Sequence, residues 1–377
     1  MLLLLLSCVL PPPALADVCD DVPAPESPGP DGRELFLRSW VPGDPRASGG
    51  DGLGPRFNDA SCVACHASGG PGGAGGADHD VRLRITRAGA EVAHATTLDR
   101  PISLELLELL STRSVARATN FADFTPPFVR RNTPALFGVG LLDAVPDEVL
   151  LEAAAVADPN FPEITGRVAH AADGRIARFG WKGQIADLDT FVATACANEL
   201  GLDVPTVAQP GPAPFGYDLD EEELSALTAF VRALPAPGNS GEEAAQGERL
   251  FHEIGCESCH RRELGGVNGV YSDLLLHDLG DAGADGAAGY GVRQVVAASD
   301  GAATAPEWRT PPLWGVRDSG PYLHDGRAVT LATAIAVHDG EAAPTRKRYL
   351  ALSAADQWAV QAFLRTLVAP AAAAVQR

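Results

Sequence analysis

Apolar residues recur at steps of three and four in two stretches of the chain. The residues of these stripes are Leu224, Leu227, Val231 and Leu234 in the first stretch and, approximately, Trp358, Ala362 and Leu367 in the second. This spacing follows one face of an α-helix, so both stretches are predicted to be amphipathic helices. Packing against a hydrophobic core explains both stripes.

The two helices close two copies of an internal repeat. Each copy opens with G-x-x-L-F and continues with T-P-x-L. A tryptophan or histidine that stands two residues before a glycine follows, and the copy ends with the closing helix. The paired segments are 32–36 and 247–251, 133–139 and 310–316, 181–188 and 324–331, and 229–234 and 362–367. Four landmarks in the same order indicate two related structural units.

Glycine and proline mark the connections between these units. A Pro/Gly-rich stretch at 234–241 is the predicted linker, and the first half carries an extra segment at about 141–178. Glycine-rich runs at 68–76 and 281–291 are predicted to be surface loops. The 377 residues exceed the usual size of one domain, and 40 Gly and 30 Pro are typical of many irregular connections.

The pattern C-x-x-C-H occurs once in each half, at Cys62–His66 and Cys256–His260. Two thiols three positions apart on a helical turn can form thioethers to the vinyl groups of haem, and the adjacent histidine can then bind the iron. A zinc knuckle or a thioredoxin-like dithiol is the alternative for a single copy. Two copies use four of the chain's 7 cysteines, so we expect two covalently bound c-type haems, held by Cys62, Cys65, Cys256 and Cys259.

The N-terminal residues predict export. A leucine-rich run followed by an A-x-A sequence indicates a signal peptide at residues 1–16, although the run is short and lacks basic residues before it. Leu5–Cys8 also resembles a lipobox, so a lipoprotein anchored through Cys8 is the alternative. Both readings predict a periplasmic location, and no other segment is long and apolar enough to span a bilayer. Whether Cys19 and Cys196 pair as a disulfide is left open.

A six-coordinate c-type haem needs a second axial ligand, usually methionine or histidine. The only methionine is Met1, which lies in the predicted signal peptide. Methionine ligation is therefore excluded for the mature protein. Each iron is expected to bind a second histidine, to bind another side chain, or to be open to a small molecule such as peroxide.

Several motifs resemble the bacterial dihaem cytochrome c peroxidase and MauG superfamily. They are the two C-x-x-C-H motifs, the T-P-x-L elements, Trp181 followed by a helix, and Leu323–Arg327. Four further stretches are similar to a branch of dihaem oxidoreductases named for thiol oxidation, namely 54–62, 178–184, 271–278 and 307–314. The resemblance covers roughly 32–367 and implies two tandem cytochrome c-like haem domains. No C-x-x-C lies outside the haem motifs, so the residues give thiol oxidation no support.

The resemblance implies a second ligand for the C-terminal haem. In these peroxidases, a methionine that stands fourteen residues after the histidine of an H-D-G element ligates the electron-transfer haem. His338 stands at that distance from His324 here. With methionine absent, His260 and His338 are the implied ligands, which should lower the reduction potential relative to a His/Met site. A solvent-facing histidine is the alternative.

The resemblance also implies roles around the N-terminal haem. The inter-haem tryptophan of the family falls on Trp181, and its distal acid falls near Glu199 when a two-residue gap is allowed. A carboxyl group above an open iron can move a proton between the two oxygens of hydrogen peroxide. The alternatives are that Glu199 only ends a surface helix and that His79 fills the sixth site. A glutamine of the family falls on Phe191, so this pocket departs from the peroxidase pattern.

Calcium is a further implication of the resemblance. Family members hold it between the domains with an Asn before T-P and with a T-x-P element, which correspond to Asn132, Thr310 and Pro312. Oxygen ligands suit this hard cation, although ordinary turn residues have the same pattern. The polar residues expected near haem propionates are His277, His324 and Arg327.

The combined prediction is a mainly α protein with haem domains at 17–240 and 241–377. The leading functional hypothesis is an exported dihaem oxidoreductase. Electrons from a small c-type cytochrome or similar protein would reach the C-terminal haem and pass through Trp181 to a peroxidase-like N-terminal haem, which reduces a small-molecule oxidant. The alternative is a pure electron-transfer dihaem cytochrome. The formal net charge of −20 favours a basic or neutral donor and disfavours nucleic acid.

Overall fold

The computed structural model describes residues 29–54, 57–79, 81–84, 93–94, 128–207, 216–240, 244–281, 283–284 and 301–371. The predicted signal peptide, Cys8, Cys19 and most of the glycine-rich run at 281–291 lie outside these residues. Among the described residues, no helix has the length and apolar character needed to cross a bilayer.

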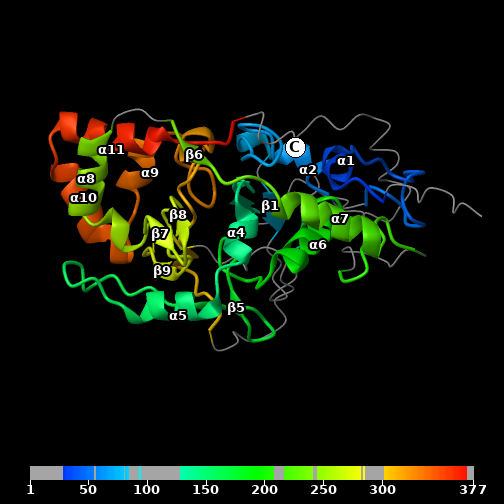
Figure 1. Cartoon of the computed structure of the whole chain (residues 1–377), viewed down its shortest axis with the longest axis horizontal. Coiled ribbons are helices and arrows are strands. Elements are labelled where there is room, and N and C mark those ends of the chain that lie inside the picture. Colours follow the sequence, from blue (N-terminus) through cyan, green and yellow to red (C-terminus); the bar gives the residue numbers. More distant parts are fainter. Residues whose placement is uncertain are drawn as a thin grey trace, which may run out of the picture.

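Short helices dominate the described residues (Figure 1). The α-helices are α1 (Gly32–Leu37), α2 (Cys62–Cys65), α4 (Val139–Asp143), α5 (Asp147–Ala155), α6 (Leu188–Glu199), α7 (Glu221–Arg232), α8 (Ala245–Glu253), α9 (Leu331–Ala336), α10 (Ala343–Ala351) and α11 (Ala354–Thr366). The 3-10 helices are η1 (Ala77–His79), η2 (Cys256–Ser258), η3 (Val316–Asp318) and η4 (Gly340–Ala342).

The strands are short and pair antiparallel. One three-stranded sheet has the order β2 (Ala93–His94), β1 (Val81–Arg84) and β3 (Phe128–Arg131). The two-stranded pairs join β4 (Ala169–His170) to β5 (Ile176–Ala177), β6 (Gly238–Asn239) to β11 (Leu367–Val368), β7 (Glu263–Leu264) to β8 (Val267–Asn268), and β9 (Leu276–Asp278) to β10 (Glu307–Arg309). The prediction of a mainly α protein is confirmed.

The repeated G-x-x-L-F pattern marks the same helix crossing in both halves. Helix α1 packs on α7, and α8 packs on α11. A Cβ at Gly32 would overlap the carbonyl oxygen of Ala226, and a Cβ at Gly247 would overlap that of Ala359. Only glycine lets the two backbones come this close, which gives the first residue of the pattern its physical reason.

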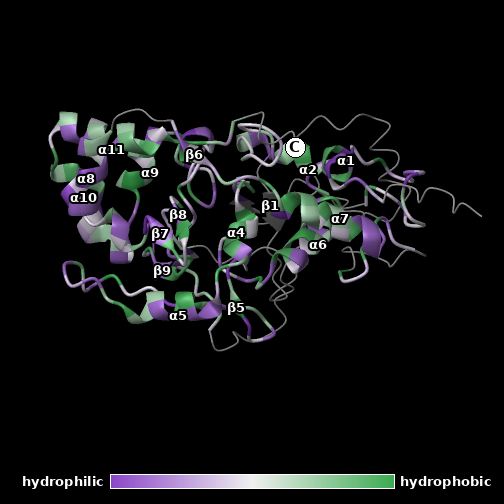
Figure 2. Cartoon of the chain, viewed as in Figure 1, coloured by the Kyte–Doolittle hydropathy of each residue, from purple (hydrophilic) through white to green (hydrophobic). Residues whose placement is uncertain are grey.

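The two predicted closing helices form as α7 and α11 (Figure 2). Helix α7 begins with a capping box between Asp220 and Glu223, and its stripe of Leu227 and Val231 is buried. One residue of the second stripe was wrongly assigned to the core. Trp358 is 61% exposed and lies under the guanidinium group of Arg365, with 4.6 Å between the guanidinium carbon and the ring centroid. The buried residues of α11 are Val360, Phe363, Leu364 and Thr366.

The glycine-rich run at 68–76 is not a surface loop, because residues 72–75 are buried. A Cβ at Gly73 would overlap the carbonyl oxygen of Ser68, and one at Gly75 would lie 2.7 Å from the carbonyl oxygen of Cys65. The run therefore folds back tightly against the first C-x-x-C-H motif. High glycine content predicts a surface loop, whereas here it permits close approach of two backbone segments.

The extra segment of the first half crosses the second half. Residues 147–168, which we call the strap, begin with α5 and continue without a further helix. In Figure 1 this stretch runs below α8 and α10. Helix α5 buries Leu150 and Ala153 and exposes the opposite face. At the end of the strap, Arg167 exchanges two backbone hydrogen bonds with Leu276, with N···O distances of 3.1 and 2.8 Å.

The end of the strap is also held by an ion pair between Arg167 and Glu307. Nε and Nη2 of Arg167 donate to the two carboxylate oxygens at 2.6 and 2.7 Å. Burial raises the pKa of Glu307, but hydrogen bonds from Arg167 and Thr304 outweigh it and bring the pKa down to about 2. A carboxylate with a lowered folded-state pKa stabilises the fold above its unfolded pKa and loses that contribution as the pH falls.

We therefore expect Glu307→Gln to lower the free energy of unfolding by about 1 kcal/mol at pH 7, a modest value because Arg167 is partly exposed. The difference from wild type should shrink as the pH falls from the unfolded value of about 4.3 towards 2. Denaturant unfolding at pH 7 and pH 3 measures it. Asp173→Asn, which removes an exposed pair with Arg175, should have little effect at either pH. A pH-independent loss would contradict this account.

Candidate functional site

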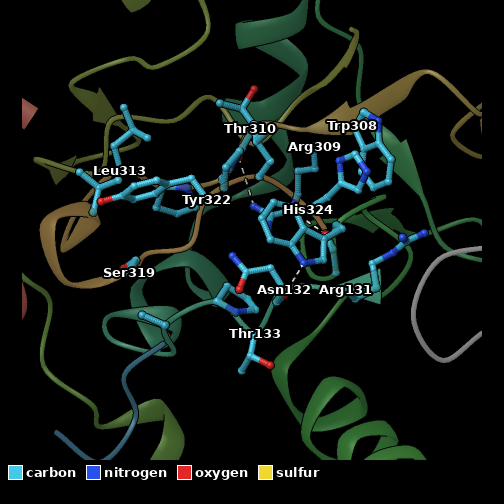
Figure 3. A pocket seen from close by; sticks show the side chains of 18 of the residues that line it. Arg131, Asn132, Thr133, Trp308, Arg309, Thr310, Leu313, Ser319, Tyr322 and His324 are labelled. Carbon is cyan, nitrogen blue, oxygen red and sulfur yellow. Dashed lines mark hydrogen bonds between the residues drawn. The ribbon is translucent and has the colours of Figure 1, made fainter. Parts of the chain in front are cut away.

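Both C-x-x-C-H motifs line one continuous cavity with a volume of about 380 Å³. Cys62, Cys65 and His66 lie along one part of it, and Cys256, Cys259 and His260 lie along another. Figure 3 shows a further part of the wall, with Arg131, Trp308 and His324 on one side and Leu313, Ser319 and Tyr322 on the other. The cavity combines apolar walls with a few buried polar groups, as sites for organic cofactors do.

The first motif is presented by α2. The hydroxyl of Ser61 caps this helix by accepting from the N–H of Ala64 at 3.1 Å. The Nδ1 of His66 lies 3.0 Å from the carbonyl oxygen of Gly73, to which it can only donate. Burial lowers the pKa of His66 to about 4, so its Nε2 carries a free lone pair at neutral pH.

The second motif repeats this arrangement on η2. The Nδ1 of His260 lies 3.0 Å from the carbonyl oxygen of Tyr271, and burial lowers the pKa of His260 to about 4. The phenylalanine of each G-x-x-L-F pattern packs beside the motif histidine. The ring centroids are 6.4 Å apart for Phe36 and His66 and 6.5 Å apart for Phe251 and His260. Both histidines are thus neutral and oriented by a carbonyl, as metal ligands usually are.

A third histidine of the same kind lies opposite the second motif. His338 follows α9 and lines the cavity, and its Nδ1 lies 2.7 Å from the carbonyl oxygen of Ala334. Burial lowers the pKa of His338. After burial, the next cause of the lowered pKa of His260 is the charge that His338 would carry. His338 is half-buried and lines the same cavity as His260.

Glu199 and Trp181 also line the cavity. Glu199 is the last residue of α6, whose first turn is capped by Asp187, and the side-chain amide of Asn58 donates to its carboxylate. The indole N–H of Trp181 donates to the carbonyl oxygen of Asn132 at 2.9 Å. The backbone carbonyl of Trp181 accepts from the N–H of Arg309 at 3.0 Å, so this residue joins segments of both halves.

His79 lies apart from the described cavity lining. It belongs to η1, and its Nδ1 lies 2.9 Å from a carboxylate oxygen of Asp59, which is itself 3.9 Å from the sulfur of Cys65. Arg327 also lies outside the described lining, and its Nε is 3.5 Å from the carboxylate of Asp325. His79 lies beside the first motif, because its ring nitrogen, the carboxylate of Asp59 and the sulfur of Cys65 lie within 4.8 Å of one another.

Two buried arginines that sequence reasoning missed lie in the cavity wall. Arg131 is 1% exposed and Arg309 is 8% exposed. Burial lowers the pKa of Arg309 to about 10, although the nearby carboxylate of Asp273 works against this shift. Each arginine directly precedes a repeated element, Asn132-Thr133-Pro134 or Thr310-Pro311, so the repeat contained a signal for them. A buried guanidinium group is stabilised by a nearby anion, and the carboxylates of haem propionates are such anions.

His324 and Trp308 stack in the wall between the two motifs. Their ring centroids are 3.6 Å apart and their planes differ by 8°. The ammonium of Lys182 lies 3.6 Å from the centroid of Trp308 and donates to three backbone carbonyls. Burial and the charges of Arg131, Arg327 and Lys182 lower the pKa of His324 to about 2, so this histidine is neutral.

His277 lies on β9, opposite Trp308 on β10 in the strand register. Its Nε2 and Nδ1 lie 3.0 Å from carboxylate oxygens of Asp273 and Glu341, respectively. The expectation that His277 contacts a propionate is therefore replaced by a charged triad. Its Nδ1 also lies 3.7 Å from the sulfur of Cys259, so the triad borders the second motif.

The residues considered for calcium fit that ion only in part. The side-chain oxygen of Asn132 is buried and has no hydrogen-bond partner among the described residues, which suits a cation ligand. The carbonyl oxygen of Thr310, however, already accepts from the hydroxyl of Ser272 at 2.8 Å and from Arg309 at 3.3 Å. Pro312 lines the cavity. The guanidinium groups nearby disfavour a second cation.

Comparison with known proteins gives a family for the C-terminal part. Residues 225–367 match the family model described as di-haem oxidoreductase, putative peroxidase. Hydrazine synthase subunit gamma from Kuenenia stuttgartiensis is 28% identical over 141 residues, which cover 30% of this chain and 40% of that protein. The match thus spans less than half of the relative's length. The predicted resemblance to dihaem peroxidases is confirmed over residues 225–367.

Two solved structures are similar at low sequence identity. A hydrazine synthase structure from Kuenenia stuttgartiensis has a TM-score of 0.42 and 15% identity, covering 94% of this chain and 99% of that chain. A MauG-like protein associated with microbial copper homeostasis has a TM-score of 0.35 and 16% identity, covering 62% and 91%. Similarities of this size support no inference about function.

Proposed function

We propose that the protein is a dihaem oxidoreductase in which each C-x-x-C-H motif carries one covalently bound haem. The observation that carries the proposal is the pair of matched histidines, His66 and His260, which are neutral, oriented by backbone carbonyls and lie in one cavity. The buried guanidinium groups of Arg131 and Arg309 fit haem because its propionates would offset their charges. When bound, the haems supply reversible one-electron chemistry and an iron able to take a small ligand.

For the C-terminal haem, His260 and His338 are the proposed axial ligands. Burial keeps both imidazoles neutral, and the carbonyls of Tyr271 and Ala334 hold Nδ1 so that Nε2 remains for iron. Two strong ligands leave no position for a small molecule. This haem is therefore assigned to electron transfer.

For the N-terminal haem, an iron open to a small molecule is proposed, with Glu199 as the nearby acid. Asn58 orients the carboxyl group, and Phe191 and Val192 of the same helix give the wall an apolar character. Reduction of hydrogen peroxide to two waters consumes two electrons and two protons, and Glu199 is placed to relay protons. His79 is not among the residues that line the cavity, which favours this reading over a closed electron carrier.

Trp181 is the proposed electron relay between the halves, because it lines the cavity and hydrogen-bonds to Asn132 and Arg309. We further propose cytochrome c-like domains at 17–240 and 241–377, export to the periplasm, and a small electron-transfer protein as donor. Calcium at Asn132, Thr310 and Pro312 stays a prediction, and no step here depends on it.

Covalent haem attachment is tested by the mass of the intact protein. When the protein is produced with the enzymes that attach c-type haem, the wild type should carry the mass of two haems. The variants Cys62→Ser/Cys65→Ser and Cys256→Ser/Cys259→Ser should each carry one. Cys196→Ser is the control, because Cys196 lies outside the motifs, and should keep both. A wild-type mass without haem would refute the proposed function.

A further inference from the structure

The strap is fastened to the second C-x-x-C-H motif at several points. The hydroxyl of Ser258, inside the motif, donates to the carboxylate of Asp158 at 2.8 Å. Arg261, which follows the motif, donates to the carbonyl oxygen of Ala153 at 3.0 Å. These contacts join the first half of the chain to the haem-attachment site of the second half.

Beneath the strap, apolar side chains fill the space between its surface and the cavity. Phe161 is buried against Gly255, where an added Cβ would overlap the phenyl ring, and Gly255 directly precedes Cys256. Ile164 is buried and lines the cavity itself. Exposed residues of the strap, such as Pro162 and Glu163, therefore lie one side chain away from the wall of the second site.

The outward face of the strap is acidic around an apolar centre. Leu151 is 50% exposed and Val156 is 63% exposed. The exposed acidic residues of the strap are Glu148, Glu152 and Glu163, together with Asp147, which pairs with Arg178. An exposed apolar group within a charged rim is typical of transient protein interfaces, in which charge sets the rate of encounter.

We infer that this face of the strap is the docking surface for a small, basic electron-transfer protein. The inference rests on the proposed function, since it requires a haem on the second motif. Basic side chains of the partner would pair with the acidic rim, and an apolar patch around its cofactor would cover Leu151 and Val156. Electron transfer becomes much slower as the distance between cofactors grows. Because the strap contacts the second motif, a partner bound to the strap would bring its cofactor close to the haem of that motif.

The basic residues nearby are engaged in the protein itself. Arg348 on α10 covers the ring of Phe161 with its guanidinium carbon 4.2 Å from the centroid, and Arg346 lies 3.0 Å from the carboxylate of Asp339. Arg261 donates to the strap backbone. Arg348 and Arg261 contact the strap, and Arg346 pairs with a carboxylate outside it.

The test is the rate at which a reduced small c-type cytochrome with a basic surface transfers electrons to the oxidised protein in stopped flow. The strap variant is Glu148→Gln/Glu152→Gln. The control is Glu221→Gln/Glu222→Gln, which removes two exposed charges from the first turn of α7, distant in Figure 1. Each pair removes two exposed carboxylates from one helix.

At low ionic strength we expect the strap variant to react about threefold to tenfold more slowly than wild type, and the control to keep most of its rate. At high ionic strength the three rates should converge. Reduction by dithionite, a strong small-molecule reductant, should be equal in all three proteins. Equal slowing of both variants, or no slowing of the strap variant, would overturn the docking site. Failure of the proposed function shows separately, as a protein without haem by mass or without reduction by dithionite.

Discussion

Replacing His338 by alanine should convert one of the two haems from low spin to high spin. The expected change is large because no other described histidine shares the cavity with His260 in a comparable arrangement, with Nδ1 bonded to a carbonyl one helical turn earlier. Removal of the imidazole leaves the iron with one strong ligand. The measurement is the electronic and electron paramagnetic resonance spectrum of the ferric protein.

Two control variants accompany this experiment. His79→Ala should leave the low-spin signal unchanged, because His79 lies outside the described cavity lining. His252→Ala removes an exposed histidine paired with Glu257 and controls for loss of an imidazole in general. A low-spin signal that survives in His338→Ala would show that another group ligates the second haem.

Glu199→Gln should lower the rate of peroxide reduction by about 10²- to 10⁴-fold, the usual contribution of a positioned acid or base. The amide has nearly the shape of the carboxyl group but cannot exchange a proton with peroxide. The haem content and the low-spin signal should stay as in wild type. Glu199 belongs to α6 and lines the cavity, but it is neither a residue of a C-x-x-C-H motif nor a proposed ligand of the second haem. Single-turnover mixing of the reduced protein with hydrogen peroxide measures the rate.

The control for this variant is Glu222→Gln, which is exposed on α7 and should react like wild type. Asn58→Leu removes the amide that orients Glu199 and should give an intermediate rate. Peroxide reduction by Glu199→Gln at the wild-type rate would exclude Glu199 as the acid. A wild-type protein that is low spin throughout and inert to peroxide would instead favour the pure electron carrier.

Local patterns were sufficient for the features that depend on neighbouring residues. The stripe on α7 predicted a buried face, and the repeat predicted matched helices because Gly32 and Gly247 mark equivalent crossings. Trp358 was misassigned because the apolar residues of α11 do not all lie on one side. The spacing of a few apolar residues does not distinguish a tryptophan in the core from an exposed tryptophan that stacks with an arginine guanidinium group.

Features that depend on distant contacts could not be read from the sequence. The burial of 72–75 arises because Gly73 and Gly75 fold against the first motif, and glycine content alone does not distinguish this from a mobile loop. The extra segment was visible in the alignment of the two halves, but nothing in its composition indicates that it crosses to Ser258 and Arg261. Arg131 and Arg309 were overlooked because buried arginine is rare unless an anion is supplied.

The path of the strap sets an order for maturation. The strap is synthesised before the motif that it covers, so under the proposed function it must remain undocked while Cys256 and Cys259 are joined to their cofactor. The attachment enzymes need access to both thiols, and the bond between Asp158 and Ser258 would obstruct them. Docking of the strap is therefore a late event, and resistance of the strap to a protease would report that the second half has been completed.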